Sequence, residues 1–278
     1  MTQLSLLSPA KLNLFLHITA RRNDGYHNLQ TIFQLIDLYD VLSFDTNHGS
    51  LQVNTLEQLK SQDNIILKAA QLLKQHTGYT GGCHIHLEKS IPVGGGVGGG
   101  SSNAATTLLA LNQLWQTGLN LTELAQLGVK LGADVPVFVL GKNAWADGVG
   151  ERLVAVDLPK TDYIVLKPDC FISTKQLFSQ ETLTRNTPET TFAAYQQYPL
   201  QFANNFEAIA KKLYPQVAEA LTYLNQFGQA RLTGTGACVF LPVTSGQNIT
   251  QIMQQAPCKS FFCHGLQQSP VHQQLGLL

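Results

Sequence analysis

Residues 92–103 read Pro92-Val93-Gly94-Gly95-Gly96-Val97-Gly98-Gly99-Gly100-Ser101-Ser102-Asn103, and they are the strongest signal in the chain. Six glycines in seven positions leave almost no Cβ atoms, so main-chain N–H groups can turn inward and approach a bulky anion closely. From Ala104 onward, apolar residues recur at i, i+4, i+7 and i+11, which predicts a helix. A glycine loop that leads into a helix N-terminus, with its free N–H donors and positive dipole end, is typical of a phosphate site.

The residues around the glycines exclude two common kinds of phosphate site. A P-loop ends in Gly-Lys-Ser or Gly-Lys-Thr, whereas Gly100 is followed by Ser101 without a lysine. A dinucleotide fold needs an acidic residue about twenty positions further on, after a second strand, but Glu123 opens an apparent helix. A flexible linker rarely lies between a strand pattern and a strong helix. We therefore predict a phosphate site of another type, with Ser101 or Ser102 capping the helix.

Composition limits the class of protein. The chain has 278 residues, 44% of them hydrophobic, which favours two domains with ordinary cores. Basic and acidic residues both total 18, and this balance disfavours a nucleic-acid partner. The sequence shows no leader and no apolar run long enough to span a bilayer, so we expect no membrane association. Five cysteines without a Cys-x-x-Cys pair indicate a reduced, cytoplasmic setting.

Two groups of cysteine and histidine residues contain side chains of the kind that bind metals. One group contains Cys258, Cys263 and His264, and the other lies in Cys-His-Ile-His-Leu-Glu at residues 83–88. In the second group polar and apolar residues alternate, which predicts a half-buried strand with its histidines in water. Neither group offers a tetrahedral ligand set. We therefore assign no metal-ligating residues.

Periodicity predicts a mixed α/β chain. Strands are expected at residues 12–16, 41–44, 83–89 and 163–166. A further apolar segment covers residues 31–38, and residues 232–240 form a small-residue turn that enters a strand. Helices are expected at residues 65–73, 104–115, 122–131, 205–213 and 215–226. Residues 185–201 are polar and contain two prolines, which predicts a loop. We place a soft boundary near residue 157, giving domains at 1–157 and 158–265, with a tail at 266–278 that returns to the first domain.

Three segments combine small residues with a polar group that a protein core does not require. They are Pro9–Asn13, the glycine loop continued to Ala105, and Leu232–Ala237. In this order and spacing they resemble the three motifs of the GHMP kinase superfamily, which includes galactokinase, homoserine kinase and mevalonate kinase. The resemblance covers nearly the whole chain. It implies an α/β fold of two-layer sandwiches, in two domains with the active-site cleft between them.

One branch of the superfamily matches more closely. The residues that carry this likeness are Arg22-x-Asp24-Gly25-Tyr26-His27, Gly132–Phe138 and Arg231–Ala237. They resemble the branch that phosphorylates the 2-hydroxyl of 4-diphosphocytidyl-2-C-methyl-D-erythritol in the non-mevalonate isoprenoid pathway. Two alternatives stay open at this point. One is another small-molecule GHMP kinase of the mevalonate or homoserine type, and the other is a nucleotide-binding regulator that has lost catalysis.

The resemblance assigns the catalytic roles to Lys11 and Asp134. Phosphoryl transfer needs a hydroxyl held in line and positive charge near the phosphoryl oxygens. A carboxylate within reach of the hydroxyl can take or orient its proton, and a lysine beside both stabilises the transition state. Without the family, we would interpret Lys11 as a solvated strand residue and Asp134 as a helix cap.

The resemblance also implies the ligand contacts. We expect ATP and Mg²⁺ as cofactors, because Mg²⁺ neutralises the charge of the β- and γ-phosphates. The expected ATP contacts are Asn64, Pro92, Gly94, Gly95, Gly96, Gly98, Gly99, Gly100, Ser101 and Ser102. The expected contacts to the substrate, cytidine diphosphate methylerythritol, are Asn13, Tyr26, His27, Phe33, Thr174 and Phe178. Tyr26 and His27 are assigned to the cytosine, since a tyrosine ring stacks and a histidine can pair with a base edge. For assembly we expect a monomer or a weak homodimer.

Overall fold

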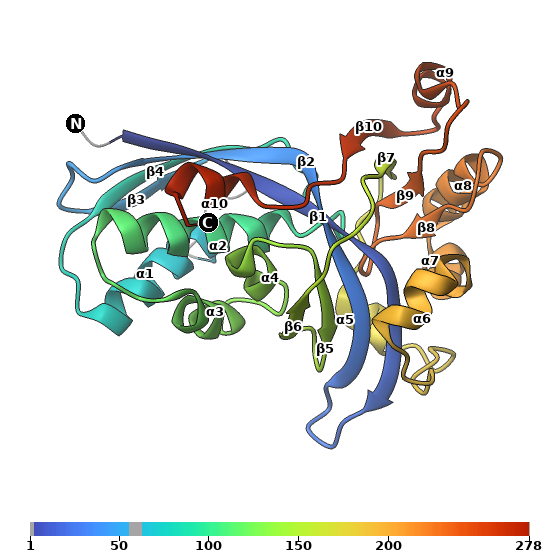
Figure 1. The fold of residues 1–278 in the computed structure, drawn as a ribbon, viewed down its shortest axis with the longest axis horizontal. Coiled ribbons are helices and arrows are strands. Elements are labelled where there is room, and N and C mark those ends of the chain that lie inside the picture. Colours follow the sequence, from blue (N-terminus) through green and yellow to red (C-terminus); the bar gives the residue numbers. More distant parts are fainter. Residues whose placement is uncertain (1–2, 56–62, 278) are drawn as a thin grey trace.

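The computed structural model describes residues 3–55 and 63–277, and a long β-hairpin runs through its centre (Figure 1). Strands β1 (Gln3–Arg21) and β2 (His27–Asp45) pair antiparallel over 19 residues each. The sequence pattern predicts two separate segments at 31–38 and 41–44, whereas the structure joins them in β2. Register shifts between Pro9 and Ala10 and between Asn13 and Leu16 bracket residues 11–13. Such irregularities re-aim side chains, and here they do so beside Lys11 and Asn13.

The first lobe is a sheet covered by helices. Strands β3 (Leu51–Asn54), β4 (Cys83–Glu88), β5 (Ala144–Asp147) and β6 (Arg152–Ala155) join the hairpin in the order β3-β4-β2-β5-β6, with β1 also paired to β2. The apolar faces of five helices share one core with this sheet. They are α1 (Ile65–Thr77), α2 (Gly99–Leu114), α3 (Leu121–Val129), α4 (Val135–Leu140) and α10 (Pro270–Leu275).

The second lobe has its own sheet and core. Its strands β7 (Asp162–Lys167), β8 (Arg231–Leu232), β9 (Val239–Pro242) and β10 (Lys259–His264) are antiparallel in the order β10-β7-β9-β8. Its helices are α5 (Thr174–Phe178), α6 (Phe192–Gln197), α7 (Glu207–Leu213), α8 (Pro215–Leu224) and α9 (Ile249–Gln254). Leu16 and Ile18 at the far end of β1 belong to this second core, so the hairpin links both lobes (Figure 1).

The loop predicted for residues 185–201 is wrong in its second half. Helix α6 forms there, followed by a 3-10 turn at Pro199–Gln201. Thr191 caps the helix, since its side chain accepts a hydrogen bond from the Ala194 N–H. The ring of Tyr195 stacks on Phe15 of β1 at 5.6 Å between centroids. Contacts with a strand distant in sequence thus order a segment whose local composition is typical of a loop.

The C-terminal residues lie against the first lobe (Figure 1). The Leu266 N–H donates to the Leu35 carbonyl at 2.8 Å, and Val271 and Leu275 are buried in the first core. The domain division at residue 157 stays a prediction. Within residues 3–55 and 63–277, no helix has the length and apolar character needed to cross a membrane.

Candidate active site

The glycine loop leads directly into α2. Gly98 is the N-cap at φ 75°, a left-handed conformation that glycine adopts without a Cβ clash. The first intrahelical hydrogen bond runs from the Ser102 N–H to the Gly98 carbonyl at 2.8 Å. The N–H groups of Gly99, Gly100 and Ser101 therefore have no acceptor within the helix. The predicted serine cap is wrong, because the left-handed glycine starts the helix one residue before Gly99 and leaves both serines inside its first turn.

The same loop is held by the main chain of the second lobe. The Ala237 N–H donates to the Gly94 carbonyl at 3.2 Å, and the Cys238 N–H donates to the Gly95 carbonyl at 3.0 Å. A Cβ on Gly96 would lie 2.5 Å from the Thr233 carbonyl oxygen. Glycine is required at this position because the two backbones leave no room for a side chain.

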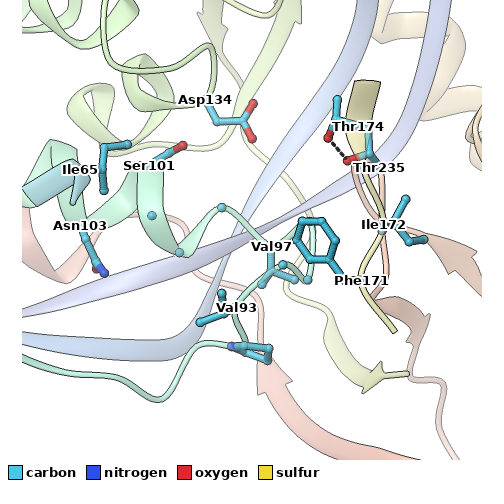
Figure 2. Close-up of a pocket in the computed structure, with 18 of the residues that line it drawn as sticks. Ile65, Val93, Val97, Ser101, Asn103, Asp134, Phe171, Ile172, Thr174 and Thr235 are labelled. Carbon is cyan, nitrogen blue, oxygen red and sulfur yellow. Dashed lines mark hydrogen bonds between the residues drawn. The ribbon is translucent and has the colours of Figure 1, made fainter. Parts of the chain in front are cut away.

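A cavity of about 770 Å³ opens beside the loop and the N-terminus of α2 (Figure 2). Asp134 lies at one end of it, while Thr174, Thr235 and Phe171 form the wall contributed by the second lobe. Most of the expected ATP contacts line this cavity, namely Asn64, Pro92, Gly94, Gly95, Gly96, Gly98, Gly99, Gly100 and Ser101. The N–H groups of Gly99, Gly100 and Ser101, which have no acceptor within the helix, make this end of the cavity suited to phosphate.

Ser102 does not line the cavity, which corrects its expected ATP contact. Its side chain is fully buried, and its Oγ is hydrogen-bonded to Ser8 Oγ at 2.7 Å. Asn64, by contrast, lines the cavity, and its side chain caps α1 by accepting a hydrogen bond from the Ile66 N–H. Ser101 thus lines the cavity, whereas its neighbour Ser102 faces the core. The two serines differ because successive residues of a helix point in different directions.

Lys11 and Asp134 are in contact. Lys11 Nζ lies 3.2 Å from Asp134 Oδ2, and the lysine is only 1% exposed. Its Nζ also donates to the Gly96 carbonyl at 3.0 Å and to the Asn13 side chain. Asp134 stands at the N-cap position of α4 but makes no side-chain capping bond. A solvated lysine and a capping aspartate are therefore both excluded as interpretations of these residues.

A second cavity, of about 580 Å³, begins where the first ends. It contains all the expected substrate contacts together with Lys11, namely Asn13, Tyr26, His27, Phe33, Thr174 and Phe178. The two cavities share Gly96, Ser101, Asp134, Thr174, Lys175 and Thr235. The Lys11–Asp134 pair consequently stands at the junction of two compartments, one beside the phosphate loop and one beside the hairpin turn.

Polar and aromatic groups define the second compartment. Asn13 Nδ2 donates to Thr31 Oγ1 at 2.9 Å, and the Asn13 N–H donates to Thr233 Oγ1 at 2.9 Å. Phe33 is buried, with Lys11 Nζ 5.4 Å from its ring centroid. The fixed asparagine places a carbonyl and an amide beside the ammonium group, so the floor of this compartment is preorganised.

The outer wall of this compartment comes from the hairpin turn and α5. The ring of His27 stacks on Phe178 with centroids 4.8 Å apart, and Tyr26 is 66% exposed. Burial lowers the pKa of His27, and the positive charges of Arg185 and Arg21 lower it further. A neutral imidazole and two aromatic faces can accommodate a flat, uncharged ring.

Sequence reasoning missed Lys89. This lysine lines the first cavity, where its Nζ donates to Asp40 Oδ2 at 2.6 Å and to the Ile91 carbonyl at 2.7 Å. Burial lowers the pKa of Lys89, while the Asp40 carboxylate opposes that shift. The only signal in the sequence is its position just before the glycine loop, because its partner lies 49 residues away. Arg185 was missed for the same reason, because its partner His27 lies 158 residues away.

Comparison with known proteins agrees with this geometry. Residues 64–142 match the model for the GHMP kinases N terminal domain, and residues 193–261 match the model for the GHMP kinases C terminal domain. A 4-diphosphocytidyl-2-C-methyl-D-erythritol kinase from Acinetobacter baylyi is 62% identical over 95% of this chain and 96% of its own length.

Solved structures show the same fold. A crystal structure of 4-(cytidine 5'-diphospho)-2C-methyl-D-erythritol kinase aligns with TM-score 0.82 and 31% identity, over 95% of this chain and 100% of the other. The mevalonate kinase of Methanococcus jannaschii aligns with TM-score 0.70 over 95% and 99% of the two chains, but with 16% identity, and so indicates the fold alone. The chain therefore belongs to the GHMP kinases and, within them, to the family of 4-diphosphocytidyl-2-C-methyl-D-erythritol kinases.

Proposed function

We propose that this chain transfers the γ-phosphoryl group of ATP to the 2-hydroxyl of 4-diphosphocytidyl-2-C-methyl-D-erythritol, giving the 2-phosphate and ADP. The observation that carries the proposal is the position of Lys11 and Asp134 at the junction of the two cavities. A kinase has to bring a triphosphate and an alcohol together end to end. Two compartments that meet at an ammonium and a carboxylate group provide that arrangement.

In this proposal the phosphates of ATP lie over the glycine loop. The N–H groups of Gly99, Gly100 and Ser101 face them from the start of α2 and stabilise their negative charge. Lys11 meets the charge that develops on the transferred phosphoryl oxygens. Its ammonium is held by the Gly96 carbonyl, Asn13 and Asp134, so it needs no reorganisation when the reaction occurs.

Asp134 acts on the alcohol. Its carboxylate lines both cavities, so it can reach the substrate hydroxyl and accept or orient its proton as the phosphoryl group leaves ADP. A positioned carboxylate of this kind contributes about 10²–10⁴-fold to the rate. The oxygen that loses its proton attacks phosphorus, and ADP leaves on the opposite side.

The residues present fit a magnesium ion that is bound mainly through ATP. Mg²⁺ keeps several waters and takes one or two protein oxygens beside substrate phosphates. Asp134 and Ser101 line the junction and offer a carboxylate and a hydroxyl there. Among residues 3–55 and 63–277, no group of three or more His, Cys, Asp or Glu could hold a metal by itself. When bound, the ion neutralises phosphate charge.

The hairpin turn supplies the substrate specificity in this proposal. Tyr26 offers an exposed ring for stacking, and His27 with Phe178 forms a second flat surface. Asn13, Phe33 and Thr174 line the path from this wall to the junction. A cytosine placed at the turn would leave the methylerythritol end of the substrate near Lys11.

The test is a coupled assay that measures ADP release from ATP and Mg²⁺ with cytidine diphosphate methylerythritol. Mevalonate and homoserine serve as competing acceptors in parallel reactions. The proposal requires turnover with the cytidine compound alone and a new phosphate monoester on carbon 2 in the ³¹P spectrum. Preferred turnover of mevalonate or homoserine would assign another GHMP activity. ATP binding without any phosphorylation would assign a regulator.

We further propose that the protein works in the cytoplasm. All five cysteines are unpaired thiols in the structure, which fits the reducing conditions of the cytoplasm. We propose a monomer or a weak homodimer. Sedimentation velocity across a range of protein concentrations tests the assembly.

A further inference from the structure

Arg185, in the segment between α5 and α6, ties together the outer wall of the second cavity. Its Nη2 donates to the carbonyls of Phe178 at 2.7 Å and Gln180 at 2.9 Å, and its Nη1 donates to Leu183 at 3.1 Å. Its Nε donates to His27 Nε2 at 3.3 Å. One guanidinium group thus holds the backbone of the stacking phenylalanine and the ring that stacks on it.

The bond to His27 determines which ring nitrogen carries the proton. Arginine has five N–H donors and no acceptor, and it stays protonated in proteins. His27 Nε2 must therefore be the acceptor, so the ring is neutral with its proton on Nδ1. Among the residues that the structure describes, Nδ1 has no hydrogen-bond partner, and the ring lines the second cavity. The ring is left with one N–H donor for a ligand.

The burial of His27 and the charges around it also favour the neutral ring. The charged groups that act on His27 are Arg185 and Arg21, and both are positive. Burial and these two charges lower the pKa of His27, so the second proton is disfavoured at neutral pH. The stack on Phe178 limits rotation of the ring. Neighbouring groups thus restrict the tautomer, the protonation state and the orientation of the His27 ring.

We propose that Arg185 is a positioning residue for base recognition, which holds His27 as an Nδ1–H donor aimed at an acceptor on the pairing edge of the base. This inference rests on the proposed function. Cytosine has an unprotonated N3 and accepts such a bond, whereas uracil carries a proton on N3 and cannot accept one there. Arg185 thereby favours cytidine over uridine substrates without touching the base.

The first test uses the protein without ligand. Histidine side-chain ¹⁵N spectra report which ring nitrogen is protonated, and Asn substitution of His27 assigns its signals. We expect the proton of His27 on Nδ1 in the wild type. In Arg185→Gln the proton should move to Nε2 or exchange between both nitrogens, and the pKa of His27 should rise. A wild-type ring protonated on Nε2 would overturn the inference, whatever the variants do.

The second test separates substrate recognition from folding. In Arg185→Gln the KM for the cytidine substrate should rise about tenfold, the equivalent of about 1.4 kcal/mol. The KM for ATP should stay unchanged, and the preference for cytidine over a uridine analogue should fall by a similar factor. Arg152→Gln, which removes an exposed arginine from β6, is the control and should change neither value. Equal increases in both KM values would overturn the inference by indicating general damage.

The third test asks whether Arg185 acts through His27. In a His27→Asn background, Arg185→Gln should cause no further increase in the KM for the cytidine substrate. Additive effects would show that the arginine acts by another route. If the wild type does not phosphorylate the cytidine compound, the proposed function fails, while the spectra still decide the tautomer.

Discussion

The substitution Asp134→Asn removes one negative charge at the junction of the cavities and keeps the shape of the side chain. Asp134 Oδ2 lies 3.2 Å from Lys11 Nζ, and the exposed side-chain fractions are 35% for the aspartate and 2% for the lysine. Lys11 retains the Gly96 carbonyl and the Asn13 side chain as acceptors in the variant. The perturbation is thus one lost carboxylate beside a lysine that keeps two of its three partners.

The substitution Asp134→Asn should lower the turnover rate greatly and the stability of the fold only slightly. Loss of a positioned general base lowers kcat about 10²–10⁴-fold. Breaking a fully buried ion pair costs about 3–5 kcal/mol, but the solvent-exposed third of Asp134 and the two remaining acceptors reduce this to about 1 kcal/mol. A change of that size lowers the Tm of a chain this long by about 2–4 °C. The variant should therefore fold and bind ATP while its turnover almost disappears.

The assay measures kcat from ADP release at saturating ATP and cytidine substrate, with a thermal melt of the same sample. Asp63→Asn is the matched control, since Asp63 also lines the first cavity but pairs with the exposed Lys68 at 2.7 Å. The control should keep its turnover. A kcat for Asp134→Asn within about threefold of the wild type would refute the catalytic role. A melting point reduced by more than about 10 °C would mean that the pair is chiefly structural.

Three further predictions follow from single contacts. Gly96→Ala should abolish activity and lower Tm, because its Cβ would meet the Thr233 carbonyl and its φ is 71°; wild-type kinetics and melting would contradict this close approach. Tyr26→Ala should raise the KM of the cytidine substrate at least about tenfold and leave the KM of ATP unchanged, as the loss of a base-stacking ring predicts; equal effects on both would indicate misfolding. His272 is buried beside the Val139 carbonyl, and burial lowers its pKa from 6.5. The unfolded chain then binds the extra proton first, so stability should fall as the pH drops below 6.5 towards the lowered pKa. Urea unfolding at several pH values should show a weaker loss in His272→Gln, and identical pH profiles would reject the assignment.

Local pattern was sufficient for the glycine loop and for most elements. The strand at 83–89, the helix after the loop and the helix opened by Asp63-Asn64 all appear as β4, α2 and α1. These signals are visible in the sequence because glycine content, capping and periodicity depend on residues a few positions apart. The family motifs also placed Lys11 and Asp134 in one site, which spacing alone does not do.

Side-chain orientation was decided only by the tertiary structure. Ser101 and Ser102 are neighbours of the same type, yet Ser101 lines both cavities and Ser102 bonds to Ser8 in the core. Helix α6 exists because Tyr195 packs on Phe15, far away in the sequence. Successive residues of a helix point about 100° apart, so two neighbouring serines can meet quite different surroundings, and only the packing of the helix decides which one faces the cavity.

The amino-acid sequence by itself predicted a chain of GHMP type in which main-chain amides at a glycine-rich turn hold phosphate. The tertiary structure decided which polar side chains meet around the two cavities. It pairs Lys11 with Asp134, Lys89 with Asp40 and Arg185 with His27, and the last two residues are 158 positions apart. Backbone conformation is governed by local sterics and is visible in the order of residues. Contacts between distant side chains are governed by the packing of whole strands and helices, and they exist only once these elements are assembled.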